Sequence, residues 1–355
     1  MTYQVTARMG KRMRKAERYS VILCALFVSF SKNLLVSVVI FMSYSLVMSM
    51  IWILLESPDL AITEAAVGAG VTSVLFFITL KRISAMGKKN EDEQDQTTKE
   101  INSRRAVRSF DRFYKVAAII LGIAIIVALI GTASNLPPFG EESNPYNNEV
   151  SERYLANGLE ETGAVNAVTG MILDYRAFDT FGESCVLFIA AACVLILLRD
   201  DKTDTTEKAI VDERFEPVSD TILQASAKIL FPAIMLFGIY ILVNGHLSPG
   251  GGFSGGAIMG AGLILHVNAF GYKKTQRFFN EKTYKKITVA ALSFYCIAKS
   301  YSFFTGANHI PSGIPLGNPG AIISSGLILP LNICVGLVVA CTMYAFYTLF
   351  KKGGM

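Results

Sequence analysis

The sequence has little charge for its length, and that charge is unevenly distributed. Asp, Glu, Lys and Arg make up 17% of the 355 residues, whereas soluble domains usually contain about 25%. Hydrophobic residues make up 52%, and long stretches carry no charge at all. Such runs are typical of a polytopic membrane protein and not of a large soluble core.

The motifs of nucleotide-dependent, metal-dependent and redox enzymes are missing as well. The chain has no phosphate-binding GxxxxGK[ST], no dinucleotide-binding turn ahead of a strand and no CxxC pair. Its three histidines, His246, His266 and His309, are too scattered to hold zinc. The six cysteines lie in apolar segments and are interpreted as small buried hydrophobic residues. We therefore expect no enzyme, no cofactor and no metal centre, with energy supplied by an ion gradient or by partner subunits.

Eight apolar segments are long enough to cross the hydrocarbon core, which takes about 20 helical residues. They predict an all-α polytopic membrane protein. The expected spans are 34–55, 59–80, 116–133, 178–198, 222–243, 253–271, 287–304 and 320–350. The last is long enough to tilt or to begin with a broken turn. A ninth candidate, Val21–Phe30, is too short to be a secure span, and we expect it at the interface or half inserted.

The distribution of Lys and Arg predicts the orientation. Basic residues gather before the first span, in the loops 81–115, 199–219 and 272–286, and at the C-terminus. The loops 134–163, 244–252 and 305–319 contain almost none. Since basic loops stay in the cytoplasm, eight spans place every basic segment inside and every bare loop outside.

Two charged, unpatterned stretches divide the chain into modules. They predict linkers over 83–113 and 201–216, between helical modules over 1–82, 114–200 and 217–355. No internal repeat is apparent, so the inverted-repeat design of secondary transporters gains no support.

Ionisable side chains inside a span are costly and are therefore functional candidates. Glu64, in SPDLAITEAAVGAG, lies about 7–8 Å deeper than Asp59 at about 1.5 Å per residue. Small residues follow it, so a neighbouring backbone can approach closely. The carboxylate can carry a proton or coordinate sodium, and the alternative is a structural ion pair with a neighbouring subunit. We expect Asp59 itself to cap the helix.

A second acidic group begins the span 178–198, in GMILDYRAFDTFGESCVLF. Asp179 and Glu183 are separated by one helical turn and share a face, where Arg176 can neutralise one carboxylate. Asp174 precedes them at the interface. The pattern predicts either ion translocation through Asp174, Asp179 and Glu183 or a salt-bridged entry turn. Glu183 is the most deeply embedded and the strongest functional candidate of the three.

Two further ionisable residues and one glycine pattern complete the candidates. Lys299, in the outer half of its span, can pair with a carboxylate on another helix. His246 can relay protons at the outer face, or it can be a hydrogen-bonded loop residue. Gly252, Gly256 and Gly260 recur every four residues and predict a smooth helix face for close packing.

Three stretches resemble components of one group of membrane complexes. NGHLSPGGGFSGGAIMGAGLIL, with ISSGLILPLNICVGLVVA (Ile323–Ala340), is similar to the B-type subunit of multisubunit Mrp-type sodium/proton antiporters. SPDLAITEAAVGAGVTSVLFFITLKR resembles the D-type subunit of membrane-bound hydrogenases. GAVNAVTGMILDYRAFDTFGESCVLF resembles the E-type subunit of the same hydrogenases. The D- and E-type modules also form the C-terminal region of the large A-type Mrp subunit, so the order suggests three small subunits fused into one chain.

The resemblance implies a non-catalytic subunit of a prokaryotic cell-membrane complex, beside larger antiporter-like subunits, with Na⁺ and H⁺ as transported ions. It maps the acid of TEAAVG onto Glu64, and those of D-x-R-x-x-D-T-x-G-E onto Asp174, Asp179 and Glu183. The first span is shorter than in the D-type family, which leaves the side of the N-terminus open. Two alternatives remain, a hydrogenase-type complex in which partner subunits drive ion export and a purely structural scaffold.

Overall fold

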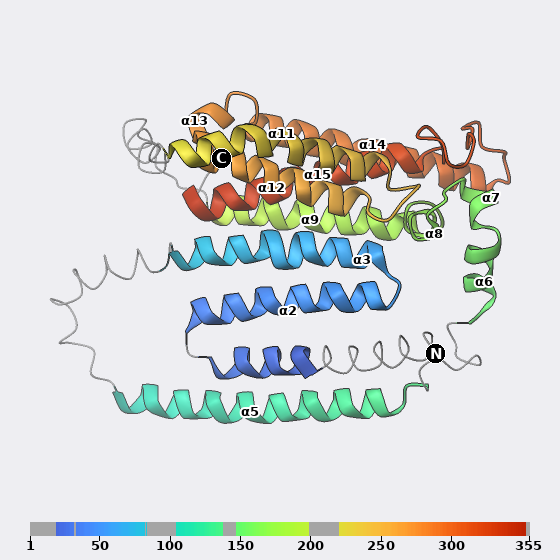
Figure 1. Ribbon diagram of the computed structural model, residues 1–355. Coiled ribbons are helices and arrows are strands. Elements are labelled where there is room, and N and C mark those ends of the chain that lie inside the picture. Colours follow the sequence, from blue (N-terminus) through green and yellow to red (C-terminus); the bar gives the residue numbers. More distant parts are fainter. Residues whose placement is uncertain are drawn as a thin grey trace, which may run out of the picture. The chain divides into compact units, whose positions relative to one another are not determined.

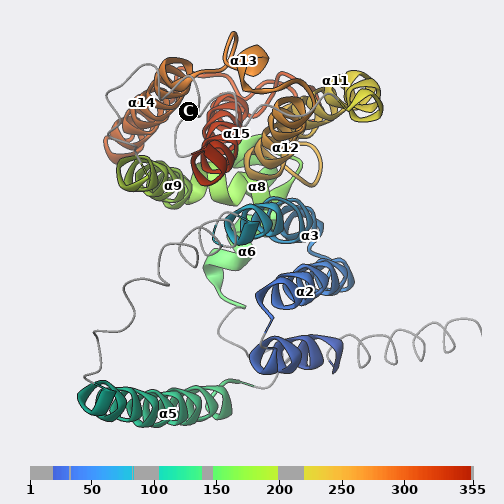
Figure 2. The same cartoon turned by 90° about the vertical axis from the view of Figure 1, so that its left-hand side faces the viewer.

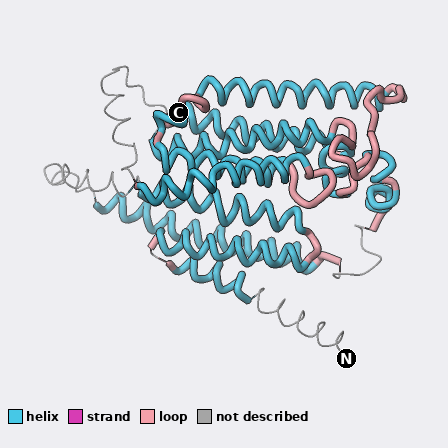
Figure 3. The backbone as a smooth tube through the Cα atoms, turned by 45° about the horizontal axis from the view of Figure 1, so that its top comes forward, coloured by secondary structure: helices cyan, strands magenta, loops and turns pink. Residues whose placement is uncertain are grey.

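The computed structural model describes residues 19–31, 33–81, 83, 104–137, 147–198 and 220–352. Within these ranges every regular element is a helix, and the loops lie at the helix ends (Figures 1 and 3). The chain forms two compact units, a larger one of Met1–Arg82 with Leu155–Met355 and a smaller one of Ile83–Tyr154. The all-α fold that the sequence predicts is confirmed.

Eight helices in the described residues are long and apolar enough to cross a membrane, as predicted. A shorter apolar helix, Tyr19–Phe30, precedes them. Residues 1–18, which bear on whether that segment crosses, lie outside the described residues, as do the predicted linker 201–216 and most of the linker 83–113. The spans are α2 (Leu34–Leu54), α3 with η1 and its continuation (Pro58–Lys81), α5 (Arg104–Ser134), α9 (Ala177–Leu197), α11 (Thr221–Val243), α12 (Gly252–Phe270), α14 (Glu281–Ala307) and α15 (Ile328–Lys352).

Three spans begin at residues other than those predicted from hydropathy. Helix α5 begins at Arg104 and not at residue 116, so residues 104–113 of the predicted linker are helical. Helix α15 begins at Ile328 and not at residue 320, because Gly320, Ser325 and Gly326 have positive φ angles of 91°, 64° and 53°. A right-handed helix does not contain such residues. Helix α14 begins at Glu281 and not at residue 287, because the Asn280 side chain caps it by accepting a hydrogen bond from the Thr283 amide. A charged first turn gives no hydropathy signal, so sequence analysis missed it.

Helix α15 lies in the middle of the larger unit, packed against α12, α14 and α9, and α11 packs against α12 (Figure 2). Glycines permit this close approach. A Cβ atom on Gly256 would lie 2.6 Å from the carbonyl oxygen of Gly336 on α15. Gly252 and Gly260 meet the same helix. The structure thus places the glycine face of α12 against α15.

Helices α2 and α3 form a hairpin, and the chain continues from α3 (Pro58–Thr63) into the π-helix η1 (Glu64–Thr72), which packs against α2. The hairpin turn places Glu56 at a φ of 59°. A second π-helix, η2 (Met171–Tyr175), leads into α9. Each π-helix holds a predicted site residue, Glu64 in η1 and Asp174 in η2. Single π-helical turns are rare and frequently lie at functional sites.

The remaining elements are short. Helix α6 (Glu149–Ala156) leads from the smaller unit, which contains α5, into the larger one. There α7 (Gly158–Thr162) and α8 (Ala167–Gly170) carry the chain to η2, and α13 (Tyr272–Thr275) joins α12 to α14. The predicted module 114–200 therefore contributes to both units, and its boundaries stay a prediction.

Candidate functional site

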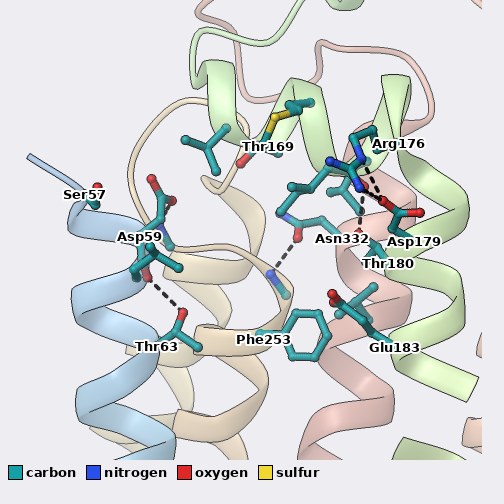
Figure 4. A pocket seen from close by; sticks show the side chains of 18 of the residues that line it. Ser57, Asp59, Thr63, Thr169, Arg176, Asp179, Thr180, Glu183, Phe253 and Asn332 are labelled. Carbon is teal, nitrogen blue, oxygen red and sulfur yellow. Dashed lines mark hydrogen bonds and ion pairs between the residues drawn. The ribbon is translucent and has the colours of Figure 1, made fainter. Parts of the chain in front are cut away.

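A cavity of about 670 Å³ opens in the larger unit, lined by residues of α3, α8, η2, α9, α12 and α15 (Figure 4). It lies at the end of the unit that carries the loop Asn244–Gly251 and the start of α15. We call this end the bare end, because its loops hold almost no Lys or Arg, and the other the basic end. The polar lining comes from all three predicted modules, as Glu56, Ser57, Asp59, Thr63, Thr169, Arg176, Asp179, Thr180, Glu183 and Asn332.

Asp59 joins the three modules at one carboxylate oxygen. Its Oδ1 accepts a hydrogen bond of 2.8 Å from the Gly250 amide and one of 3.1 Å from the Asn166 side chain. The Asn166 amide group also donates to the carbonyl oxygens of Gly245 and Ser248, at 3.3 and 3.2 Å. Asp59 therefore fixes the glycine loop on α3, a larger role than the helix-capping that we expected.

Two more polar contacts support the wall of the cavity. The hydroxyls of Thr63 on α3 and Ser254 on α12 lie 2.9 Å apart. Asn332 on α15 accepts a hydrogen bond of 2.6 Å from the Gly252 amide and donates one of 3.2 Å to the Leu242 carbonyl oxygen. Asn332 thereby binds both ends of the glycine loop to the central helix.

The carboxylates of α9 differ in their partners. Arg176 forms an ion pair of 2.5 Å with Asp179, and both side chains are more than half exposed, at 59% and 56%. Glu183, one turn further, also lines the cavity, and its side chain points toward Phe253 (Figure 4). Among the described residues Glu183 has no hydrogen bond or ion pair. Glu183 in α9 and Glu56 in the turn before α3 are thus the two lining carboxylates whose charge no contact within the described chain offsets.

Lys299 lies buried on α14, and its ammonium group is 3.1 Å from a carboxylate oxygen of Asp174 in η2. The lysine side chain is 4% exposed and the aspartate 39%. Beside this pair the buried Tyr295 donates a hydrogen bond of 2.9 Å to the Ala177 carbonyl oxygen. The structure thus supplies the carboxylate partner on another helix that the sequence led us to expect for Lys299.

Glu64 is set apart from the cavity. It is half-buried, and its Oε1 lies 2.6 Å from the position that a Cβ of Gly68 would occupy. The Ser45 hydroxyl of α2 approaches the same point to 2.8 Å. The Glu64 carboxylate therefore lies where η1 meets α2, over the small residues that follow it in the sequence.

His246 is fully buried in the glycine loop at the bare end. Its Nε2 lies 3.2 Å from the Ala321 carbonyl oxygen, whereas its Nδ1 has no partner in the described part of the chain. The hydrogen-bonded loop histidine is the arrangement seen, and the outer proton relay stays a prediction.

Three residues of this arrangement were missed by sequence reasoning, namely Asp59 as a junction, Asn166 and Asn332. Asn332 carried a signal, because it is a lone amide in the apolar run LILPLNICVG. Polar side chains at such positions commonly bond across helices. Asn166 stands in a loop and carried no such signal.

Comparisons with known proteins decide the family. A domain related to the MnhB subunit of Na⁺/H⁺ antiporters matches residues 222–345. The D subunit of MBH matches residues 20–85, and the E subunit of MBH matches residues 108–212. The chain belongs to the subunit family shared by Mrp-type antiporters and membrane-bound hydrogenases. The resemblance drawn from the sequence motifs is confirmed.

The chain covers most of one relative but only about a fifth of two longer ones. An uncharacterized protein of Methanocaldococcus jannaschii is 33% identical over 209 residues, which are 54% of this chain and 77% of that protein. A probable K⁺/H⁺ antiporter A/B subunit of Rhizobium meliloti is 26% identical over 65% of this chain. The chain spans only 23% of that relative, and 21% of the A1 subunit of a Na⁺/H⁺ antiporter of Staphylococcus haemolyticus.

Two solved complexes contain similar chains. In the Mrp complex of Dietzia sp. DQ12-45-1b, the TM-score is 0.63 at 22% identity, over 96% of this chain and 34% of that one. For the similar chain in the archaeal membrane-bound sulfane sulfur reductase, the TM-score is 0.50 at 30% identity, and the match covers 66% of this chain and 96% of the reductase chain. The first shows a shared fold, and the second extends the family to a respiratory complex.

Proposed function

We propose that the chain is a non-catalytic subunit of a multisubunit monovalent cation/proton antiporter, where it contributes carboxylates to the ion route beside larger antiporter-like subunits. The observation that carries this proposal is the cavity of about 670 Å³, where Asp59 and Glu183 from two modules line one space among membrane-spanning helices. Carboxylates at such positions persist where water, a cation or a partner subunit compensates them. The family membership supports the setting in an antiporter assembly.

The local charges favour Glu183 as the ion-binding group of the cavity. Asp59 is held by two hydrogen bonds, and Asp179 by the guanidinium group of Arg176. Glu183 has no such partner within the described residues. Glu56 is also unpaired but lies in the α2–α3 turn, whereas Glu183 lies within a membrane-spanning helix and is therefore our candidate to take up a proton or a cation. In the proposed route, a monovalent cation that enters at the bare end binds at Glu183.

Glu64 forms the second step of the proposed route. Its carboxylate lies at the η1–α2 contact, where the neighbouring side chains are those of Ser45 and the small residues of η1. One carboxylate and one hydroxyl are too few ligands to enclose a cation. The position therefore suits proton transfer, or a cation site that a partner subunit completes.

The test uses the assembled complex in inverted membrane vesicles, with cation-dependent proton movement followed by a pH-sensitive dye. We expect Glu64→Gln to abolish transport while co-purification of the partner subunits stays normal. Glu183→Gln should weaken the apparent cation affinity about tenfold, the effect of losing one charge-assisted contact. Glu160→Gln, an exposed change in α7 away from the cavity, is the matched control.

The outcomes separate the transport role from a scaffold role. Normal transport by both variants would remove these carboxylates from the route. Loss of assembly in Glu64→Gln, with transport normal in whatever complex remains, would favour a scaffold.

A redox-driven complex is the second candidate. It is favoured by the 30% identity to a chain of the sulfane sulfur reductase, of which this chain covers 96%. Purification of the chain with its partners decides between the two. Flavin or iron–sulfur absorption in the complex would support the redox-driven setting, and its absence from an active complex would support the antiporter.

A further inference from the structure

The contact between α9, α14 and α15 contains buried hydroxyl groups that packing leaves without partners. Within the described residues, four such hydroxyl oxygens have no hydrogen bond of normal geometry. Their side chains are at most 3% exposed. A buried hydroxyl without a partner costs about 1–3 kcal/mol, so native proteins rarely keep several together. The four are Ser184 on α9, Tyr284 and Thr288 on α14, and Thr342 on α15.

The two of these hydroxyls that lie on α14, those of Tyr284 and Thr288, share one face of the helix with Tyr295 and Lys299. Tyr284, Thr288, Tyr295 and Lys299 lie within about 60° of one another around the helix axis, at about 3.6 residues per turn. They extend over about 22 Å at about 1.5 Å per residue. The stripe therefore runs from the basic end to the Lys299–Asp174 pair, along the contact with α9 and α15.

Side chains of the neighbouring helices extend the stripe. The Tyr284 hydroxyl lies beside that of Thr342, and Thr288 lies beside the thiol of Cys341. The largest gap between neighbouring hydroxyl residues of the stripe on α14 is that between Thr288 and Tyr295. It is about 10 Å at the same rise per residue.

Ser184 falls within this gap. The rings of Phe181 on α9 and Tyr295 on α14 stack with centroids 5.3 Å apart. These two residues therefore lie at about the same height along the two helices. Ser184 lies three residues beyond Phe181 toward the basic end, about 4.5 Å further along the helix. Its orphan hydroxyl thus stands about midway between Tyr295 and Thr288. We call Ser184, Tyr284, Thr288, Tyr295 and Thr342 the hydroxyl seam.

We infer that the hydroxyl seam holds a file of water molecules and conducts protons between the basic end and the Lys299–Asp174 pair. Water at this seam would give Ser184 a partner and would complete the loose contacts between Tyr284 and Thr342 and between Thr288 and Cys341, as buried waters commonly do. No seam residue carries a carboxylate, so a metal cation in the seam would lack a counter-charge, whereas a proton can pass between hydroxyl and water oxygens. In each hop one O–H bond breaks on the donor oxygen as another forms on the acceptor, and no oxidant or reductant is needed.

At the bare end the file meets acidic groups. Tyr295 lies near both Asp174 and Glu183, and Glu183 lines the cavity. A proton that arrives at Asp174 neutralises the partner of Lys299 and leaves the ammonium group as the local positive charge. The inference goes beyond the proposed cation route, because the proton path runs along α14, α15 and α9 and not through Glu64.

The experiment compares Thr288→Val, which keeps the shape and removes the hydroxyl, with Thr288→Ser, which keeps the hydroxyl. Both are studied in the assembled complex in proteoliposomes with an internal pH dye. We expect proton flux to fall about tenfold in Thr288→Val and in Ser184→Ala, the effect of losing one hydrogen-bonded step. Thr288→Ser and the control Thr348→Val should keep their flux, because the Thr348 hydroxyl already donates to the Ala345 carbonyl oxygen at 2.9 Å.

Cation affinity and thermal stability provide the second readout. The half-saturating cation concentration should stay unchanged in the seam variants, whereas Glu183→Gln should raise it, so the two proposals fail separately. The midpoint of thermal unfolding should not rise in Thr288→Val if its hydroxyl binds water. A raised midpoint with unchanged flux would show a dry seam and overturn the inference, as would equal loss of flux in Thr288→Ser and Thr288→Val.

Discussion

At the scale of single residues, Asp59 and the four acids that the sequence predicts differ in the groups that offset their charge. Asp59 has two hydrogen-bond donors, Asp179 has Arg176, and Asp174 has Lys299. Glu64 and Glu183 have no partner within the described chain. These two are also the acids that the sequence favours most, since they lie deepest in their apolar segments. Their unoffset charge is consistent with a place in the ion route, which stays a prediction.

The Lys299–Asp174 pair provides a residue-scale prediction. Asp174→Asn leaves a buried ammonium group without its counter-charge, and we expect a loss of about 3 kcal/mol in the free energy of unfolding. The double change Asp174→Asn with Lys299→Met should recover most of that loss, because an apolar side chain replaces the unpaired charge. Thermal unfolding of the purified chain in detergent measures both.

The contrary outcome is equally clear. If Asp174→Asn alone is as stable as the parent chain, solvent at the 39% exposed aspartate offsets the lysine, and the pair contributes nothing to stability. Glu281→Gln, which removes an exposed ion pair with Lys285 on the same helix, is the control and should change little.

At the scale of elements, the close approach of α12 to α15 depends on glycine. Small residues at helix contacts let backbones approach within a membrane, where no hydrophobic effect drives helices together. The asparagine that joins these helices, Asn332, adds a polar contact to the glycine loop. Together they position the wall of the cavity on a rigid pair of helices.

The glycine contact is testable by adding one methyl group. In Gly256→Ala the Cβ would lie 2.6 Å from the Gly336 carbonyl oxygen and 2.7 Å from the Cβ of Val339. We expect a loss of about 1–3 kcal/mol in unfolding free energy from overpacking. Gly182→Ala on α9 is the control, because nothing lies within 4 Å of its added Cβ. Similar stability of the two variants would show that α12 shifts to accept the methyl group.

At the scale of the whole molecule, side-chain contacts and not only the linkers join the three modules of the larger unit. Asp59 and Asn166 link the first and second modules to the glycine loop of the third. Lys299 of the third pairs with Asp174 of the second, and Ser325 donates a hydrogen bond of 2.8 Å to the Gly163 carbonyl oxygen. The fused chain thus behaves as one interlocked body in this unit.

This arrangement predicts that the linker 201–216 is dispensable for association. Residues 1–200 and 217–355, expressed together as two chains, should co-purify in detergent, because the contacts that join the modules lie outside the linker. The same pair with Asp59→Ala and Asn166→Ala should yield less complex, whereas Glu160→Gln should not reduce it. Failure of the unmodified halves to associate would show that covalent fusion is required.

The sequence by itself determined the membrane class, the eight spans and the family. These rest on the length and polarity of segments and on contiguous motifs, which are local properties of the chain. It also pointed to the embedded acids Glu64 and Glu183 as candidates, since a charge in an apolar run is visible without a structure, and their role stays a prediction. Helix ends were less accurate, as α14 and α15 show, because caps and positive φ angles do not register in hydropathy.

Only the tertiary structure decided which groups meet. The Asp59 junction, the Lys299–Asp174 pair and the hydroxyl seam each join residues that lie far apart in the chain, on separate helices. No local pattern encodes such a meeting, because it depends on how helices rotate and slide against one another when glycines and large side chains pack. The sequence shows which side chains can ionise or form hydrogen bonds. Packing decides which partner each one has, and therefore which charges remain unpaired.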